Sequence, residues 1–235
     1  MKKIAIIPAR GGSKRIPRKN IKPFLGKPII AYSIEAAVHS GLFDEVMVST
    51  DDKEIAEISK CFGASVPFFR STASSNDFAT TADVLTEVLE QYKNKGNTYD
   101  YGCCLYPTAP LINQQTLHKA QDLLLQKQYN CVFPVVKFSY PIWRSLKLEN
   151  GKAEMNWPEH LNTRSQDLPP AYHDAGQFYW FHVDTFLQNK TIIGSNAGAV
   201  ELDETEVQDI DNLTDWKLAE LKYQLSHERQ KDQDE

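Results

Sequence analysis

Short apolar segments alternate with longer segments of helical periodicity over the first 136 residues. Residues 2–8 (KKIAIIP) form an Ile-rich run that ends at Pro8, which is typical of a strand buried on both faces. Comparable strand-like runs recur at 45–50, 66–70, 99–107 and 131–136. Amphipathic segments, most of them closed by glycine, lie between these runs at 28–41, 51–64, 80–96 and 113–128. This order predicts an α/β fold with a mainly parallel sheet and crossover helices.

The pattern changes after residue 136. Residues 137–183 are rich in aromatic residues and proline and contain an Asn-Gly turn signal at 150–151, which predicts a β-rich excursion. Strand character returns over 197–211, and residues 213–230 have the pattern of a terminal helix. With 235 residues, 41% of them hydrophobic, the chain is long enough for one domain with a single large core.

Positive charge is concentrated in one short stretch of an acidic chain. Seven basic residues and no acidic ones lie between Arg10 and Lys27, although the formal net charge of the chain is −5. Removing these seven from the 26 basic residues leaves 19 against 31 acidic residues, so the remainder carries −12. A nucleic-acid-binding protein more often has a basic stripe on a basic whole, so the cluster favours a small polyanion as ligand.

The basic stretch directly follows the first predicted strand, where ligands bind in open α/β sheets. Glycines let backbone amides approach an anion closely, and a hydroxyl and cationic side chains add donors. The residues that fit a phosphate-binding role are Arg10, Gly11, Gly12, Ser13, Lys14 and Lys19. The stretch matches neither GxxxxGK[ST] nor GxGxxG. The alternative interpretation is a solvated charge cluster.

Asp209 and Asp211 form an acidic pair at i and i+2. If residues 206–211 are a strand, both carboxylates point to one face, where a cation would relieve their repulsion. Mg²⁺ prefers a few carboxylates together with phosphate oxygens and water. The alternative is that Asp211 or Thr214 caps the terminal helix. Asp51 and Asp52 could similarly approach a ribose, although a helix N-cap is the simpler interpretation.

Five stretches, in this order, resemble motifs of the CMP-sialic acid synthetase family of cytidylyltransferases. They are ARGGSKRIPRKN at 9–20, VPFFRSTASSNDFATTADV at 66–84, LYPTAPL at 105–111, RSQDLPPAYHDAGQFYW at 164–180 and QDID at 208–211. The resemblance implies a Rossmann-like three-layer nucleotidyltransferase fold of the nucleotide-diphospho-sugar transferase type. It also implies an enzyme that transfers CMP from CTP to the anomeric hydroxyl of a nine-carbon α-keto sugar acid, with release of pyrophosphate.

The resemblance also implies roles for individual residues. The basic stretch would hold the β- and γ-phosphates, with Arg10 and Lys19 as catalytic residues. Asn20 matches a residue that contacts the nucleotide in the resembling family. Further matches near the cytidine are Arg70, Ala79 and Thr81, and Asp77 would help to order that segment. The QDID stretch matches a Mg²⁺ motif, which assigns Asp209 and Asp211 as metal ligands and Asp211 as a proton acceptor.

The implied sugar site lies in the segment after residue 163. Arg164 matches the partner of the sugar carboxylate, and the other candidates are Tyr106, Gln166, Tyr172, His173, Asp174 and Gln177. His173 could instead be structural and donate to a backbone carbonyl. Sialate enzymes more often have Asn-Gly-Ala where this chain has DAGQ, and Gln in place of Tyr106. These departures argue against N-acetylneuraminate. Residues 137–147 (KFSYPIWRSLK) and 171–181 (AYHDAGQFYWF) most resemble the members of the family that act on pseudaminate, which implies pseudaminate as the substrate, with legionaminate and N-acetylneuraminate as alternatives.

Aromatic residues in the excursion, around 138–175, suggest a protein contact. In the resembling family this element is a dimerisation arm that reaches over the partner's site, so we expect a homodimer. A monomer with the arm folded on its own core is the alternative. The four cysteines form no CxxC pair and no membrane-length apolar run is present, which favours reduced, mostly buried thiols in a cytoplasmic protein.

Two other classes of protein share parts of this pattern. An Asp-x-Asp pair after a strand is also typical of metal-dependent glycosyltransferases, but that class leaves the basic stretch unexplained. A nucleotide sensor would bind CTP without turnover. The basic stretch and the segment 164–179 occur together only in the cytidylyltransferase interpretation.

Overall fold

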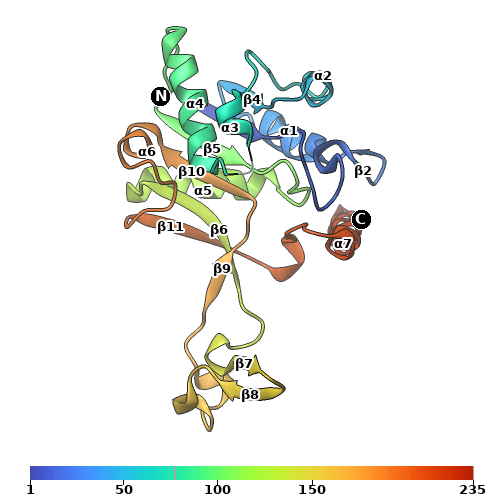
Figure 1. Ribbon diagram of the computed structural model, residues 1–235, viewed down its shortest axis with the longest axis vertical. Coiled ribbons are helices and arrows are strands. Elements are labelled where there is room, and N and C mark those ends of the chain that lie inside the picture. Colours follow the sequence, from blue (N-terminus) through green and yellow to red (C-terminus); the bar gives the residue numbers. More distant parts are fainter. Residues whose placement is uncertain (77, 235) are drawn as a thin grey trace.

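A mixed seven-stranded sheet forms the centre of the computed structural model, which describes residues 1–76 and 78–234 (Figure 1). The strands of this sheet are β1 (Lys3–Pro8), β4 (Glu45–Ser49), β5 (Tyr101–Leu105), β6 (Cys131–Lys137), β9 (Tyr172–Asp174), β10 (Phe178–His182) and β11 (Ala197–Leu202). Their order is β11-β6-β10-β5-β1-β4, with β9 paired to β6. β1 is parallel to β4 and β5, and β6 is parallel to β11, which confirms the predicted α/β class.

Strand β10 differs from its prediction. We expected residues 178–182 to belong to the β-rich excursion, but they lie antiparallel between β5 and β6 in the middle of the sheet. Phe178, Tyr179, Trp180 and Phe181 are all buried. An uninterrupted apolar run of this kind needs cover on both faces, which only a central strand receives.

Helices cover both faces of the sheet. They are α1 (Ile29–His39), α2 (Lys53–Cys61), α3 (Thr72–Ser75), α4 (Thr81–Asn94), α5 (Gln114–Lys127), α6 (Val183–Asn189) and α7 (Leu213–Asp234). One core cluster joins α1, α2 and α5 to one face of the sheet, and the other joins α4 and α6 to the opposite face. In β1, for example, Ala5 and Ile7 face the first cluster, whereas Ile4 and Ile6 face the second. The sequence analysis did not predict α6.

Two predicted strands are absent from the described residues. In the segment 66–70, pairing stops after a single bridge between Ser65 and Met47, because Pro67 has no N–H to extend the ladder. The segment 206–211 is not a strand either. β11 ends at Leu202, and Asp203 and Glu206 then form a capping box around a 3₁₀ turn.

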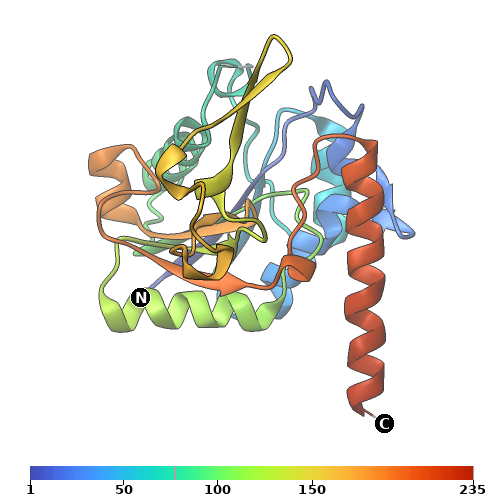
Figure 2. The same ribbon diagram turned by 90° about the horizontal axis from the view of Figure 1, so that it is seen from below.

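A third core cluster lies outside the sheet and joins distant parts of the chain. It contains Ile16 from the basic stretch, Phe24 from the small hairpin β2 (Pro23–Phe24) and β3 (Lys27–Pro28), and Ile210 beside the acidic pair. Trp216 and Ala219 on α7 also belong to it and Tyr223 packs against it, whereas the C-terminal part of α7 extends away from the body (Figure 2). This cluster therefore packs the basic stretch against the segment that carries Asp209 and Asp211.

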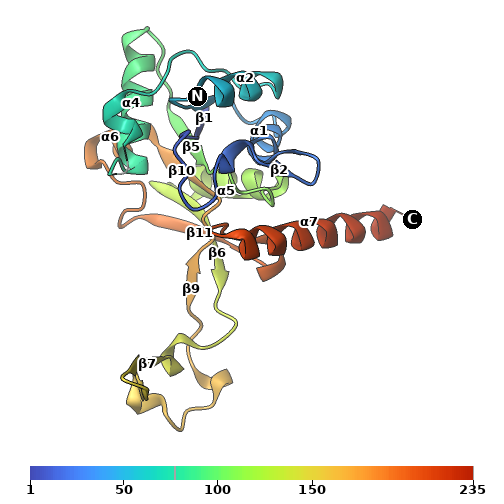
Figure 3. The same cartoon turned by 45° about the vertical axis from the view of Figure 1, so that its right-hand side comes forward.

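The segment between β6 and β9 leaves the body of the molecule as an arm, residues 138–171 (Figures 1 and 3). It contains the hairpin β7 (Leu146–Glu149) and β8 (Lys152–Met155). The rings of Trp143 and Trp157 pack edge to face at 5.4 Å, and Trp143 Nε1 donates to the Pro169 carbonyl at 2.9 Å. Large apolar side chains remain exposed on the arm: Tyr140, Leu146, Leu148 and Leu161.

The four cysteines are free thiols, as expected, but they do not share one environment. Cys103, Cys104 and Cys131 are buried, whereas Cys61 at the end of α2 is exposed. None of the described helices combines the length and the apolar character needed to cross a membrane.

Candidate functional site

The basic stretch forms a loop between β1 and the 3₁₀ turn Lys19–Ile21, at the carboxyl end of the parallel strands. Its start is tied to the sheet, because the Ala9 amide donates to the Ser49 carbonyl at 2.9 Å. Asn20 is buried and its Nδ2 donates to the Arg10 carbonyl at 2.9 Å. Asn20 therefore holds the two ends of the loop together. We call residues 10–18 the phosphate loop, after the role that the sequence predicts for it.

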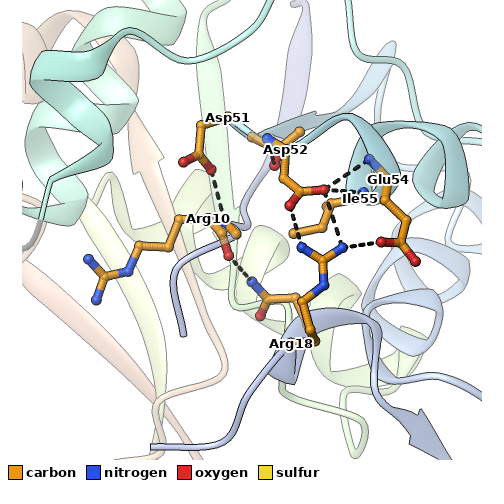
Figure 4. Close-up of polar contacts among 9 residues, drawn as sticks. Arg10, Arg18, Asp51, Asp52, Glu54 and Ile55 are labelled. Atoms are coloured by element: carbon orange, nitrogen blue, oxygen red, sulfur yellow. Dashed lines mark hydrogen bonds and ion pairs between the residues drawn. The ribbon is translucent and has the colours of Figure 1, made fainter. Parts of the chain in front are cut away.

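The two glycines of the phosphate loop have different surroundings. The Gly11 amide donates to Asp51 Oδ1 at 2.9 Å (Figure 4), and a Cβ at Gly11 would lie 2.7 Å from Asp52 Oδ2. Gly11 therefore allows the start of α2 to approach the loop. A Cβ at Gly12 would meet nothing within 4 Å, so Gly12 faces open space. Of the two glycines, Gly12 is the one that leaves room for a ligand.

Tertiary structure places acids beside three of the seven clustered bases. Arg15 pairs with Asp211 at 2.5 Å. Arg18 pairs with both Asp52 and Glu54, and Lys27 pairs with Glu35. The local excess of positive charge is thus smaller than the sequence suggested.

Lys19 lies at the junction of the basic and acidic segments. Its half-buried ammonium donates to the carbonyl of Ile210, the residue between Asp209 and Asp211. Burial lowers the pKa of Lys19 below its ordinary value, and the nearby Asp211 and Asp209 carboxylates oppose part of that shift. Residues 190 positions apart are therefore brought into one site, even though the predicted strand is absent.

The helix-cap alternative for the acidic pair is wrong. Asn212 Oδ1 accepts the amides of Thr214 and Asp215 at 2.8 and 3.0 Å, and Asp215 Oδ2 accepts the Asp211 amide at 2.9 Å. Asn212 and Asp215 thus cap α7, and the Asp211 carboxylate lies beside Arg15 and Lys19 instead. In contrast, the cap interpretation of Asp52 is confirmed, because its side chain accepts two amides at the start of α2.

The donor set around Asp209 and Asp211 fits a partly hydrated cation. No group of three or more His, Cys, Asp or Glu side chains able to hold a metal occurs in the part of the chain that the structure describes. Two carboxylates beside the basic loop match Mg²⁺, which keeps several waters and takes phosphate oxygens as ligands. They do not match a structural ion enclosed by protein ligands.

The segment predicted to lie near the cytidine packs over the ends of β4 and the phosphate loop. Arg70 is largely buried; its Nη2 donates to the Ser49 carbonyl at 2.6 Å, and burial lowers its pKa. The Ala79 amide donates to Asn76 Oδ1 at 3.0 Å, and Arg10 Nη1 donates to the Asn76 carbonyl at 3.3 Å. Arg10 therefore connects the phosphate loop to this segment. Thr81 begins α4, and Asp77 lies outside the described residues.

Two predicted sugar residues, Asp174 and Tyr106, share a network with Tyr179, which the sequence analysis missed. Tyr179 donates to Asp174 Oδ2 at 2.6 Å, and the Gly176 amide donates to Asp174 Oδ1 at 2.8 Å. Burial and this hydrogen bond raise the pKa of Tyr179, so the hydroxyl remains a donor. The ring of Tyr106 lies 5.5 Å from that of Tyr179. Tyr179 could have been found from the sequence only by recognising residues 178–182 as a central strand, whose side chains point alternately to the two faces of the sheet.

The remaining predicted sugar residues lie in three different settings. Gln177 is 3% exposed and its Nε2 donates to the Glu206 carbonyl at 2.7 Å, so it ties β10 to the turn after β11. Tyr172 and His173 lie on β9, where His173 Nδ1 is 2.9 Å from the Asp174 carbonyl, as the structural alternative proposed. Arg164 and Gln166 belong to the arm, which extends away from the phosphate loop of the same chain (Figure 3).

These features define a nucleotidyltransferase, and the comparisons name its family: the chain belongs to the cytidylyltransferases, whose family model matches residues 4–229. It is 44% identical over 229 residues to a pseudaminic acid cytidylyltransferase of Campylobacter jejuni subsp. jejuni serotype O:2, covering 97% of this chain and 99% of that protein. It is 31% identical to a CMP-N,N'-diacetyllegionaminic acid synthase of Legionella pneumophila, covering 97% and 99% of the two chains. The family assignment removes the glycosyltransferase hypothesis.

Solved structures support the fold independently. A CMP:2-keto-3-deoxy-manno-octonic acid synthetase complexed with CTP superposes with a TM-score of 0.70 at 19% identity, covering 97% of this chain and all of that chain. A 4-diphosphocytidyl-2C-methyl-D-erythritol synthase from Anaerococcus prevotii superposes with a TM-score of 0.64 at 12% identity, covering 95% and 98%. At these identities the similarity concerns the fold alone, and it confirms the predicted nucleotidyltransferase architecture.

Proposed function

We propose that this cytidylyltransferase couples CTP to pseudaminate, forming CMP-pseudaminate and pyrophosphate in the cytoplasm for glycosylation of flagellin or surface glycans. The observation that carries the sugar assignment is the 44% identity, over nearly the whole of both chains, to a protein named for that reaction. The legionaminate relative is less similar, at 31% identity. The departures at Tyr106 and in the DAGQ segment also favour pseudaminate over N-acetylneuraminate.

The phosphate loop and Lys19 supply the charge that this reaction requires. Phosphoryl-group chemistry depends on positioning and on neutralising charge rather than on covalent help from the protein. Arg10, Gly12, Ser13 and Lys14 would hold the β- and γ-phosphates over the open side of the loop. Lys19 would stabilise the charge that develops on the departing pyrophosphate.

Asp209 and Asp211 would hold Mg²⁺ together with phosphate oxygens and water. When bound there, the ion supplies Lewis-acid polarisation of the α-phosphate. Asp211 would also accept the proton of the anomeric hydroxyl as that oxygen attacks the α-phosphorus. For both roles the Asp211 carboxylate must give up part of its ion pair with Arg15, so that its oxygens can contact the cation or the sugar hydroxyl.

The sugar site would be completed by a second copy of the chain. Arg164, the expected partner of the sugar carboxylate, is carried by the arm, which extends away from the body of its own chain (Figure 3). Exposed apolar residues on the arm, including Leu146 and Leu148, provide a surface for such a contact. We therefore propose a homodimer in which each arm supplies Arg164 to the partner's nucleotide site.

The homodimer can be tested by subunit complementation. We expect Lys19→Met and Arg164→Ala homodimers each to lose nearly all turnover. Refolding or co-expressing the two variants in equal amounts should restore about a quarter of wild-type activity, because half of the dimers then contain one intact composite site out of two. Mixing Lys19→Met with Asp209→Asn is the matched control. Both defects then lie on the body, so recovery in this mixture, or none in the first, would contradict the composite site.

The sugar assignment can be tested by measuring pyrophosphate release. The protein is supplied with CTP, Mg²⁺ and, in separate reactions, pseudaminic, legionaminic and N-acetylneuraminic acids. We expect the largest kcat/KM with pseudaminate, exceeding the others by at least about 100-fold, because buried groups that lose a hydrogen-bonding partner disfavour the wrong sugar strongly. A larger kcat/KM with either other acid would overturn the choice of sugar. Binding of CTP without pyrophosphate release from any of the three would support the sensor hypothesis instead.

A further inference from the structure

Three acids at the start of α2 contact the phosphate loop at two points, as Figure 4 shows. Asp51 Oδ1 accepts the Gly11 amide at 2.9 Å. At the other end of the loop, both terminal nitrogens of the Arg18 guanidinium donate to Asp52, and one of them also pairs with Glu54. We call these five residues the loop clamp. It holds the segment that contains Gly12, Ser13 and Lys14 from both sides.

Asp52 is the centre of the loop clamp because its carboxylate both caps α2 and pairs with Arg18, which also donates to Oδ1 at 3.4 Å. Oδ1 accepts the amides of Glu54 and Ile55 at 2.9 and 3.0 Å, which caps α2. Oδ2 pairs with Arg18 and faces Gly11 so closely that a Cβ there would lie 2.7 Å away. The cap fixes the orientation of the carboxylate, and the carboxylate fixes the position of Arg18.

Arg18 has an unusual backbone conformation that agrees with this role. Its φ of 57° and ψ of 30° place it in the left-handed region, which a non-glycine residue adopts only when its surroundings hold it there. Its guanidinium is turned toward Asp52 and Glu54 (Figure 4). Arg18 is therefore an anchor for the loop rather than one of its phosphate donors.

We propose that Asp52, acting through Arg18, is a positioning residue for the triphosphate of CTP: it fixes the phosphate loop in its open conformation before the nucleotide binds. This inference rests on the proposed function. Binding that orders a loop is weakened by the conformational entropy lost, and an ordered loop avoids that loss. The clamp thus increases affinity for CTP without contacting it.

A merely structural role of Asp52 makes a different prediction. If Asp52 served only as the cap of α2, any residue that caps equally well would leave nucleotide binding unchanged. Asn and Asp are nearly equivalent as N-caps. Asp52→Asn therefore keeps the cap acceptor and removes the charge that pairs with Arg18. The matched control is Glu57→Gln, which removes an exposed ion pair with Lys60 elsewhere on α2.

The decisive measurement is calorimetric titration of the full chain with CTP and Mg²⁺ in the absence of sugar. We expect Asp52→Asn to raise the Kd for CTP about fivefold, with a thermal midpoint close to that of wild type, and Glu57→Gln to leave the Kd unchanged. An unchanged or lower Kd in Asp52→Asn would overturn the proposal. Failure of the wild-type protein to bind CTP would instead overturn the proposed function.

A double-variant cycle tests whether Asp52 acts through Arg18. If it does, Arg18→Gln and the combined variant should raise the Kd to about the same value as Asp52→Asn alone, because each removes the same pair. Fully multiplicative effects would mean that the two residues act separately, and this would contradict the proposed route. In turnover assays, the KM for CTP should rise about fivefold while the KM for the sugar stays constant.

Discussion

Replacing Lys19 by methionine is expected to lower kcat/KM by a factor of about 100 to 1,000, since removal of one charge-stabilising donor typically costs this much. The Lys19 ammonium is half-buried, contacts the Ile210 carbonyl and lies near both carboxylates of the acidic pair. Methionine keeps the apolar length of the side chain and removes the charge. The measurement is steady-state pyrophosphate release at varied CTP, with a thermal melt to confirm folding.

Lys22→Gln is the control for Lys19→Met. Lys22 lies three residues further along the same basic cluster, and its ammonium is 5.6 Å from the centroid of the Trp216 ring. If general attraction of CTP by the cluster explained the effect, both variants would lose similar activity. We expect Lys22→Gln to change kcat/KM by less than about threefold, because exposed charges contribute little individually. Activity of Lys19→Met within that same range would remove Lys19 from the catalytic residues.

Asp209→Asn is expected to lower kcat about 100-fold at ordinary Mg²⁺ concentrations, which corresponds to about 2.7 kcal/mol of lost transition-state stabilisation. The amide keeps the size of the side chain and loses the negative charge that is proposed to hold the cation. Part of the activity should return as Mg²⁺ is raised, because a weakened site fills at higher metal concentration. The measurement is kcat across a Mg²⁺ titration.

Asp215→Asn is the matched control for Asp209→Asn. Asp215 also lies close enough to Lys19 to affect its pKa, but its carboxylate accepts the Asp211 and Asn212 amides at the start of α7. Asparagine retains an acceptor for that cap. We expect near wild-type kcat and an unchanged Mg²⁺ requirement. If both variants lose activity equally, the effect is one of net charge near Lys19, and Asp209 is not a metal ligand.

The net charge around the basic cluster differs between the sequence and the folded chain. The sequence contains no acid between Arg10 and Lys27, so the segment alone predicts a strongly positive loop. In the folded chain, Arg15 pairs with an acid in the segment before α7. Arg18 pairs with the N-cap residue of α2, and Lys27 pairs with an acid on α1. Those acids are close only because the elements that carry them pack around the loop. Some of the bases therefore anchor the loop instead of adding to its net charge.

The sugar residues show a second difference of this kind. The motif at 164–180 is continuous in sequence, but the structure divides it between the arm, β9 and β10. Arg164 and Tyr179 are therefore far apart within one chain, although a linear motif suggests that they act together. Only the path of the chain through β9 back into the sheet reveals this separation (Figure 1).

The sequence by itself determined the α/β class, most helices and the position of the phosphate loop after β1, because these follow from local periodicity and from residues adjacent in the chain. Only the tertiary structure decided that β10 lies in the middle of the sheet, that α2 clamps the loop, and that Lys19 meets the segment 209–211. The contact of Lys19 with Ile210 joins residues 191 positions apart, and the packing of Ile16 and Ile210 in one cluster brings them together. No local pattern encodes such packing, since it depends on how whole elements cover one another's apolar faces.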